Sequence, residues 1–391
     1  MTEKRLFSTL SYLLLMCAFA VAAADKPITV PFRLVDNRIF VELIVNGRGP
    51  YACIFDTGAG QVLSLNAATN IGLHVESAGL TGGVGEQPVE LGQARIQSAA
   101  IGAAEVRDRS VNILELDDTP HVFGKQKVDA IFGAPFFEKY QVVIDYDRRE
   151  LSFLPAGSPP PAGALSIPFS RPDNIPVVEA ELDGVPARFG VDTGARSALL
   201  LYGPFIEKNN LREKYKAHLE GITGWGIGGP VRSQLARAKS LTIGPAKLTD
   251  IVIRLSTQKK GLLTGTHLDG LIGPDVLRQF RVTFDYAKNR MYLKKSSVYG
   301  TRDAYDRSGA WLGQKGDHFP VLDVIPGSPA AQAGLKEGDD VLEINGHATA
   351  TLLLPEARAQ MRALPPGTRV ELEIRSNGQI RKVVITLRDL L

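Results

Sequence analysis

"FDTGAG" at residues 55–60 and "VDTGAR" at residues 191–196 place the tetrapeptide Asp-Thr-Gly-Ala twice in one chain, each time behind apolar residues. One Asp-Thr-Gly is a weak signal, because any surface turn can contain these three residues. The two copies lie 136 residues apart, however, and further matching stretches surround both of them in the same order. The repeat therefore predicts that the chain contains two similar halves.

Four more pairs of stretches support this repeat. Each pair matches in length and in the spacing of its apolar residues, and the offset between partners stays nearly constant along the chain. The pairs are 30–47 with 167–184, 79–89 with 221–231, 129–133 with 269–273, and 140–154 with 280–294. Chance does not place five landmarks in one order twice, so each half should fold into the same unit.

Each half is expected to consist mainly of short strands. "FVELIVNG" and "VEAELDG" alternate apolar and polar residues before an Asn-Gly or Asp-Gly turn, which is typical of a β-hairpin. One helix per half is predicted at "APFFEKY" (134–140) and at "PDVLRQF" (274–280). The 39 glycines and 24 prolines also favour a turn-rich β protein over a helical bundle.

Two aspartates held within about 3 Å of each other provide a specific chemistry. They cannot both ionise, so they share one proton at mildly acidic pH. The ionised carboxylate can draw a proton from a bound water, while the protonated partner donates to a carbonyl oxygen. A glycine after each Asp-Thr lets the two turns approach closely. Such a pair can hydrolyse an amide without a metal or a covalent intermediate.

These motifs resemble the retroviral-type and pepsin-type aspartic peptidases. The resemblance covers about 28–295 and rests on the doubled Asp-Thr-Gly-Ala and on the later apolar-apolar-Gly at 131–133 and 271–273. It implies a bilobal β fold in which Asp56 and Asp192 are the catalytic pair. The residues that would support this pair are Thr57, Gly58, Thr193 and Gly194.

The same resemblance implies that the glycine-rich hairpins at 79–89 and 221–231 are flaps that cover the substrate. Their substrate-binding residues would be Gly82, Gly83, Gly85, Trp225, Gly226 and Gly228. "GWGIGG" also fits the glycine spacing of a dinucleotide site, but Pro230 follows it where such a site needs a helix, so we favour the flap.

The chain departs from the retroviral pattern behind the aspartates. Gly60 and Arg196 stand where those enzymes usually have a further Asp, and only the second half keeps an acid after the later glycine, at Asp275. The ion pairs that join the viral lobes should therefore be absent or rebuilt. The sequence leaves open whether the halves pair within one chain or between two chains.

Residues 300–391 do not repeat and predict a separate small α+β domain. This segment resembles a bacterial PDZ domain, in which backbone amides of a loop capture the carboxylate of a peptide. By this resemblance "AWLG" at 310–313 is the carboxylate-binding loop, with Trp311, Leu312 and Gly313 as its binding residues. The alternative is that Trp311 belongs to a core that packs on the rest of the protein.

The N-terminus predicts export. Lys4 and Arg5 precede a short apolar run that ends in Ala22-x-Ala24, which is typical of a secretory signal peptide cut after residue 24. The run is shorter than the roughly 20 residues that a membrane span needs. We expect a periplasmic protein without a stable membrane span after cleavage, in which Cys53 is the remaining cysteine and a core residue.

The predicted organisation is therefore mostly β, with two retropepsin-like lobes that form a bilobal aspartic peptidase and a PDZ domain. The expected boundaries are a signal peptide at 1–24, a first lobe at 25–154, a Pro-rich linker at 155–164, a second lobe at 165–297, and a PDZ-like domain at 300–391.

The functional prediction is an exported aspartic endopeptidase that acts on polypeptides, with a C-terminal peptide as a further ligand of the PDZ-like domain. We expect no cofactor and no metal, because the six histidines show no metal-ligand spacing. A net charge of +3 without a long basic run gives no indication of nucleic acid binding. The alternative is a periplasmic scaffold that keeps this fold and binds peptides without cutting them.

Overall fold

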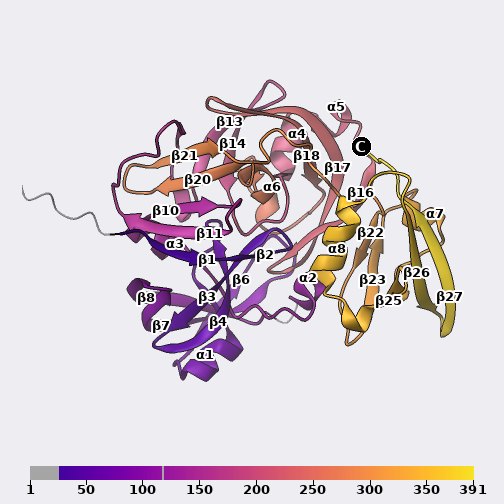
Figure 1. Ribbon diagram of the computed structural model, residues 1–391, viewed down its shortest axis with the longest axis horizontal. Coiled ribbons are helices and arrows are strands. Elements are labelled where there is room, and N and C mark those ends of the chain that lie inside the picture. Colours follow the sequence, from indigo (N-terminus) through magenta and orange to yellow (C-terminus); the bar gives the residue numbers. More distant parts are fainter. Residues whose placement is uncertain (1–25, 117–118) are drawn as a thin grey trace, which may run out of the picture.

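The computed structural model describes residues 26–116 and 119–391. About half of the residues are in strands, and the strands form four sheets (Figure 1). The predicted signal peptide lies outside the described residues. The sheets divide into one for each half of the repeat, one that both halves build together, and one in the C-terminal part of the chain.

The first lobe is an eight-stranded sheet in which the predicted hairpin at Asn46-Gly47 is present. Both turn residues have positive φ, 50° and 74°, as this hairpin type requires. In spatial order the strands are β2 (Arg33–Val35), β3 (Arg38–Val45), β4 (Arg48–Asp56), β9 (Ala130–Gly133), β5 (Val62–Ser64), β8 (Ala104–Leu114), β7 (Val89–Ile101) and β6 (Glu76–Thr81).

The second lobe repeats this arrangement in a seven-stranded sheet. Its hairpin at Asp183-Gly184 again has two positive φ angles. The spatial order is β13 (Val177–Leu182), β14 (Val185–Val191), β19 (Gly270–Ile272), β15 (Leu199–Leu201), β18 (Ala246–Ser256), β17 (Gly229–Ile243) and β16 (Leu219–Gly226). In both lobes the strand that leads to Asp-Thr-Gly runs parallel to the strand of the apolar-apolar-Gly motif.

A six-stranded sheet joins the two lobes. Its order is β1 (Ile28–Pro31), β11 (Glu150–Pro155), β10 (Tyr140–Asp145), β20 (Phe280–Asp285), β21 (Arg290–Lys295) and β12 (Leu165–Pro168). At its centre β10 pairs with β20, its equivalent in the repeat, and Val143 faces Thr283. Phe137 packs edge-on against Phe284, so the apolar core continues from one lobe into the other. The two halves are therefore one folded body.

The helices predicted at 134–140 and 274–280 are present as α3 and α6, but each half has more than the one helix expected. The helices are α1 (Leu65–Ile71), α2 (Pro120–Phe123), α3 (Ala134–Lys139), α4 (Gly203–Lys208), α5 (Leu211–Lys214) and α6 (Pro274–Leu277), with 3₁₀ turns η1 (Pro172–Asn174) and η2 (Leu262–Thr264). The sequence carried a signal for α1. Ser64 caps its first turn by accepting from the Ala67 amide at 3.1 Å, and Gly72 ends it with φ 77°.

The C-terminal domain has a sheet and an apolar core of its own. Its strands are β22 (Ala310–Leu312), β23 (Phe319–Val324), β24 (Asp340–Ile344), β25 (His347–Ala348), β26 (Arg369–Ser376) and β27 (Gln379–Thr386). Its helices are α7 (Pro329–Gln332), α8 (Leu354–Ala363) and the 3₁₀ turn η3 (Thr349–Thr351). Figure 1 shows α8 on the side of this domain that faces the lobes. There Ile325 packs on Leu219 and Leu235 of the second lobe.

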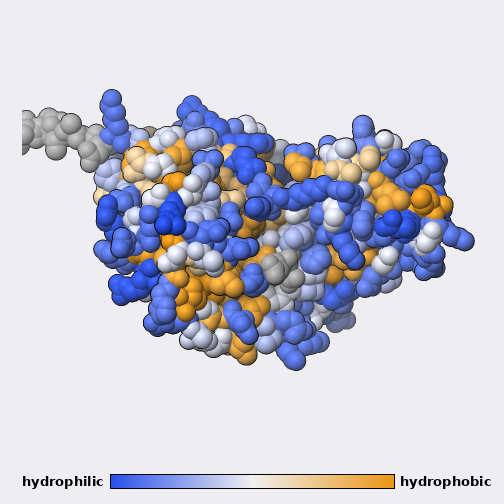
Figure 2. Space-filling view, turned by 90° about the horizontal axis from the view of Figure 1, so that it is seen from below, coloured by the Kyte–Doolittle hydropathy of each residue, from blue (hydrophilic) through white to orange (hydrophobic). Residues whose placement is uncertain are grey.

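The surface is largely polar. Seen from below, hydrophilic residues cover most of the protein and the apolar ones form separate patches on the larger body and on the C-terminal domain (Figure 2). Leu80 and Ile380 are the most exposed of the large apolar side chains, at 68% and 63%. Among the described helices, none has the length and apolar character needed to cross a membrane.

Candidate active site

The two predicted aspartates occupy equivalent places in the lobes. Asp56 is the last residue of β4, and Asp192 directly follows β14. The glycine of the later motif lies directly behind each loop. A Cβ atom on Gly133 would lie 1.8 Å from the Asp56 carbonyl oxygen, and one on Gly273 would lie 2.2 Å from the Ser197 carbonyl oxygen. The apolar-apolar-Gly motif is therefore needed because no other residue leaves room for the loop.

The two loops of this one chain meet face to face, and the Gly58 and Gly194 backbones form the contact. A Cβ on Gly194 would lie 2.1 Å from Asp56 Oδ2, and a Cβ on Gly58 would lie 2.6 Å from Asp192 Oδ1. Each glycine thus lets its loop reach the carboxyl group of the other lobe.

Thr57 and Thr193 hold the loops together through a reciprocal set of hydrogen bonds. The Thr57 amide donates to Thr193 Oγ1 at 3.0 Å, and the Thr193 amide donates to Thr57 Oγ1 at 3.1 Å. Each hydroxyl in turn donates to a backbone carbonyl of the opposite strand, Thr57 to Val191 at 2.7 Å and Thr193 to Phe55 at 2.9 Å. All four bonds are buried, so this join resists separation of the lobes.

The two carboxyl groups share one electrostatic environment and hydrogen-bond to each other. Burial and the charge of Asp192 raise the pKa of Asp56 well above its usual range. Burial also raises the pKa of Asp192, although it accepts bonds from Asp56 and from the amides of Gly194 and Ala195, which lower that pKa in part. The two aspartates therefore titrate as one unit and can share a single proton.

The two glycine-rich hairpins cover the aspartates and touch each other. The Gly85 amide donates to the Ile227 carbonyl, and the Gln87 amide donates to the Gly228 carbonyl, each at 3.0 Å. A Cβ on Gly85 would lie 2.1 Å from the Gly228 carbonyl carbon. Of the remaining predicted flap residues, Gly82 and Gly83 lie on the first hairpin, where Gly82 is exposed and Gly83 is buried. Trp225 and Gly226 lie on the second hairpin. All four residues line the cleft below the hairpins.

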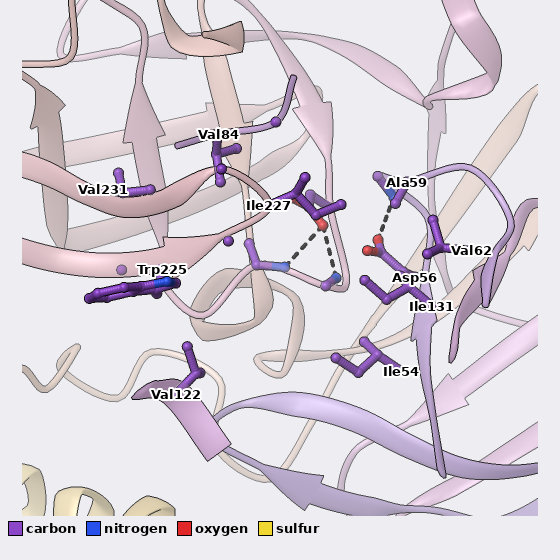
Figure 3. A pocket seen from close by; sticks show the side chains of 18 of the residues that line it. Ile54, Asp56, Ala59, Val62, Val84, Val122, Ile131, Trp225, Ile227 and Val231 are labelled. Atoms are coloured by element: carbon purple, nitrogen blue, oxygen red, sulfur yellow. Dashed lines mark hydrogen bonds between the residues drawn. The ribbon is translucent and has the colours of Figure 1, made fainter. Parts of the chain in front are cut away.

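The cleft between the aspartates and these hairpins has a volume of about 600 Å³. In Figure 3, Ile54, Val62 and Ile131 lie beside Asp56, whereas Val84, Trp225, Ile227 and Val231 lie toward the hairpins. Most of these apolar residues were not predicted from the sequence, because a side chain that lines a cleft has the same local pattern as one in a core. Among the described residues, no three His, Cys, Asp or Glu side chains are grouped so that they could hold a metal ion.

A charged cluster lies behind the second aspartate loop and was missed. Arg38 Nε donates to the Gly194 carbonyl at 2.8 Å, and Arg196 pairs with Asp36 at 2.9 Å. Asn37 Nδ2 bridges the Arg196 carbonyl, at 2.9 Å, to the Asp275 carboxylate. The sequence signals were Arg196, which departs from the retroviral pattern, and Asp275, which keeps the acid of that pattern in the second half alone.

The C-terminal domain completes this cluster. Arg362 on α8 reaches Asp275 at 3.0 Å. Burial alone would raise the pKa of Asp275, but Arg362 and Arg278 outweigh burial and hold that pKa below its usual range. Arg358, one turn earlier, donates to the carbonyls of Val122 and His121 at 3.0 and 2.8 Å. The domain therefore contacts both lobes next to the candidate site.

The segment predicted as the carboxylate-binding loop, 310–313, lies against the lobes, and its binding of a carboxylate stays a prediction. Ala310–Leu312 is strand β22, which pairs with β23, and the Gly313 amide donates to the Pro320 carbonyl at 2.8 Å. The Trp311 indole is buried between the guanidinium groups of Arg196 and Arg358, whose central carbons lie 5.0 and 4.3 Å from its ring centre. The Leu312 carbonyl accepts from Arg358. The segment therefore contacts the lobes through cation–π packing of Trp311 and through the Leu312 carbonyl, while β22 pairs with β23.

Comparison with known families agrees with this division of the chain. The family described as aspartyl protease matches residues 41–136 and 178–276, one segment in each lobe, and the PDZ domain family matches residues 321–376. The mostly β fold with two aspartic-protease lobes and a C-terminal PDZ domain is thereby confirmed.

Individual relatives share shorter or more distant likeness. The carboxyl-terminal-processing protease of Synechocystis sp. is 48% identical over 62 residues, 16% of this chain and 14% of that protein. The periplasmic pH-dependent serine endoprotease DegQ of Escherichia coli is 37% identical over 67 residues, 17% of this chain and 14% of that protein. The chain thus spans about one seventh of the length of these curated relatives.

Two solved structures are also similar in part. The aspartic proteinase from Irpex lacteus is 14% identical with a TM-score of 0.45, over 71% of this chain and 99% of that chain. The retropepsin-like aspartic protease from Rickettsia conorii is 22% identical with a TM-score of 0.25, over 34% of this chain and 89% of that chain.

Proposed function

We propose that this chain, which belongs to the aspartyl protease family through both of its lobes and ends in a PDZ domain, is an aspartic endopeptidase. Asp56 and Asp192 are its catalytic residues. The observation that carries this proposal is the contact between the two loops, where Gly58 and Gly194 each lie against the aspartate of the other lobe. A peptidase of this type needs two carboxyls at one water, and this packing supplies them.

In the proposed reaction Asp192 is ionised and Asp56 protonated. Asp192 takes a proton from a water held between the carboxyls, and that water's oxygen bonds to the peptide carbonyl carbon while Asp56 donates its proton to the carbonyl oxygen. The tetrahedral product then collapses. Asp192 passes the proton that it took from water to the leaving nitrogen, and the C–N bond breaks. One hydroxyl of the intermediate returns a proton to Asp56, so the two peptides separate as a carboxylic acid and an amine and the pair regains its starting state.

The paired hairpins and the apolar cleft support an endopeptidase acting on a polypeptide. Closure over the cleft excludes bulk water, so the interactions of the aspartates with substrate act in a low dielectric. The tips at Gly85 and Gly228 touch directly, so a polypeptide must part them to enter or leave. We therefore assign opening of the hairpins as the step that admits substrate.

We assign the enzyme to the periplasm. The support is the charged start and short apolar run of residues 1–24, together with similarity over short segments to a relative whose name describes it as periplasmic. The PDZ domain indicates peptide binding. We propose that it binds the C-terminus of a substrate or partner.

Cleavage of a mixed peptide library, followed by mass spectrometry, tests the proposal. We expect cleavage within peptides by the wild-type protein and none by the Asp192→Asn variant, which is nearly the same in shape. Binding of peptides without cleavage by the wild-type protein would instead identify a scaffold. A contaminating protease is excluded if the variant, purified in the same way, leaves the library intact.

A further inference from the structure

Arg254 on β18 is a buried cation, and two of its three guanidinium nitrogens make no hydrogen bond to the described residues. Its exposed fraction is 6%, and within residues 26–116 and 119–391 its Nε and Nη1 atoms have no hydrogen-bond acceptor. A buried guanidinium normally has a carboxylate or several carbonyls around it, because an unpaired buried charge costs several kcal/mol. The other buried arginines here follow this rule. Arg254 therefore requires an explanation other than stability.

Its position points to the cleft. Arg254 lines the 600 Å³ cleft that contains the aspartates, and it also lines a second cavity of about 50 Å³ between the second lobe and the PDZ domain. Arg196 and Thr223 line both spaces as well. The guanidinium thus lies where the end of the cleft passes into a small recess of a size suited to one small polar group.

The carboxylates that act on Arg254 are Asp275 and Asp303, of which neither accepts a hydrogen bond from Nε or Nη1. Arg196 pairs with Asp36 and Arg362 with Asp275. Burial together with the Arg196 and Arg362 charges lowers the pKa of Arg254 to about 10, so it stays protonated at neutral pH.

The two acids that line the recess also have donors of their own. The Asp323 carboxylate accepts from the Ile222 amide at 2.6 Å and from Arg232 at 3.1 Å. The Asp306 carboxylate accepts from the Ser308 amide and hydroxyl at 2.7 and 2.6 Å. Four arginines and two aspartates line the recess, and both of these aspartates already accept hydrogen bonds from other donors.

We infer that Arg254 forms a subsite that binds a carboxylate of a polypeptide lying in the cleft. This inference rests on the proposed function, because it requires that the cleft binds polypeptides. A guanidinium presents two parallel donors that match a carboxylate. The carboxylate is either an Asp or Glu side chain or the C-terminal group of the peptide. In both cases Arg254 selects the substrate, while the aspartates carry out the chemistry.

Peptide binding to the full chain with Asp192→Asn tests this without any turnover. The first series of probes consists of fluorescent octapeptides of apolar residues with an amidated C-terminus and a single Glu, placed at a different position in each peptide. The second series has Gln in place of Glu. The third series has the same Gln peptides with a free C-terminal carboxylate. We expect a Glu peptide, or the free-carboxylate peptides, to bind about tenfold or more tightly than the matched neutral peptide. Which of the two series shows the gain identifies the source of the carboxylate.

The preference should depend on Arg254 alone. The ratio of affinities for charged and neutral peptides should fall to about one in Arg254→Met and be intermediate in Arg254→Lys. The control variant Arg375→Met removes a half-exposed arginine paired with Asp340 and should leave this ratio unchanged. Equal binding of charged and neutral peptides throughout, or a ratio that survives in Arg254→Met, would overturn the inference.

Stability provides a second readout. Because Arg254→Met removes a buried charge whose Nε and Nη1 make no hydrogen bond, its melting temperature should be equal to that of the parent protein or higher, whereas an arginine held by a strong ion pair would give a lower one. If Arg254→Met does not fold, that result contradicts the inference. A charge preference without any peptide cleavage by the wild-type protein would refute only the proposed peptidase, and cleavage without a charge preference would refute only the subsite.

Discussion

The two aspartate loops share one tetrapeptide but have different surroundings. Behind Asp56 the neighbours are aromatic, since Phe55 packs against Phe136 and Phe137 with ring centres 6.2 and 4.9 Å apart. Behind Asp192 they are charged, with Arg196 paired to Asp36 and with Asp275 three residues after the loop's partner strand. Equivalent positions in the repeat thus carry Pro135 in one lobe and Asp275 in the other.

This difference shows what a two-lobed chain can do that a symmetric pair cannot. The first loop is held by apolar packing within its own lobe. The second is held by ion pairs, and one of these, Arg362 with Asp275, comes from the PDZ domain. The acid pair needs symmetry only at the carboxyl groups, so the support behind each loop is free to differ. In this chain the second support links the candidate site to a peptide-binding domain.

The largest expected effect is on kcat and comes from the two aspartates, which are the part of the loops that is the same in both lobes. Asp56→Asn and Asp192→Asn should each lower kcat at least about a hundredfold, because the two residues act as one acid–base pair. The double variant should be no worse than either single one. Steady-state kinetics on a peptide that the wild-type protein cuts measures this. Retention of more than a few per cent of activity by either variant would mean that the aspartates do not form one unit.

The second effect concerns the charged support. Asp275→Asn should destabilise the protein by about 3–5 kcal/mol, because Asp275 is buried and pairs with both Arg362 and Arg278, and activity should fall with it. Urea unfolding measures the free energy. Asp340→Asn, which breaks a partly exposed pair with Arg375 inside the PDZ domain, is the control and should cost about 0–1 kcal/mol. Equal costs for the two variants would contradict a support role for Asp275.

The third effect concerns the hairpins. Gly85→Ala places a methyl group 2.1 Å from the backbone of Gly228, so the two tips cannot meet as they do here, and kcat should fall about tenfold. Gly203→Ala at the start of α4 meets only an ordinary contact at 3.7 Å and should change nothing. Wild-type kinetics in Gly85→Ala would show that contact between the tips is not part of the working state.

The smallest expected effect is on the pH dependence of activity, which reports the pKa values of the aspartate pair. Because the pKa of both aspartates is raised, the singly protonated pair should persist to a higher pH than isolated aspartates allow, and activity should follow a bell centred at about pH 5–6. Activity is lost on the acid side when the pair gains a second proton and on the alkaline side when it loses the proton that it shares.

Ala59→Ser combined with Ala195→Ser tests this. Each hydroxyl would donate to a carboxylate and so favour its ionised form, and both limbs of the pH profile should move to lower pH by less than about one unit. A wild-type optimum near pH 2–3, or limbs that do not move in the Ser pair, would refute the argument.

Much of the fold could be predicted from local sequence. The hairpins at Asn46-Gly47 and Asp183-Gly184 follow from residues that tolerate positive φ, and the repeat predicts two lobes whose equivalent strands β10 and β20 pair at the centre. The additional helices were not predicted, and the carboxylate-binding role of "AWLG" stays a prediction. Trp311 has an apolar local pattern that fits a ligand pocket and an interface equally well, and only the neighbouring lobe decides between them.

The sequence by itself determined the paired Asp-Thr-Gly loops and the glycines behind them, because these depend on backbone geometry that only particular residues allow. The tertiary structure alone decided what lies next to each loop. Arg254, Arg358 and Arg362 are far from Asp192 along the chain, and nothing in their local sequence marks them. Their roles arise because burial makes each charge depend on its neighbours, and those neighbours are set by how the PDZ domain packs on the second lobe.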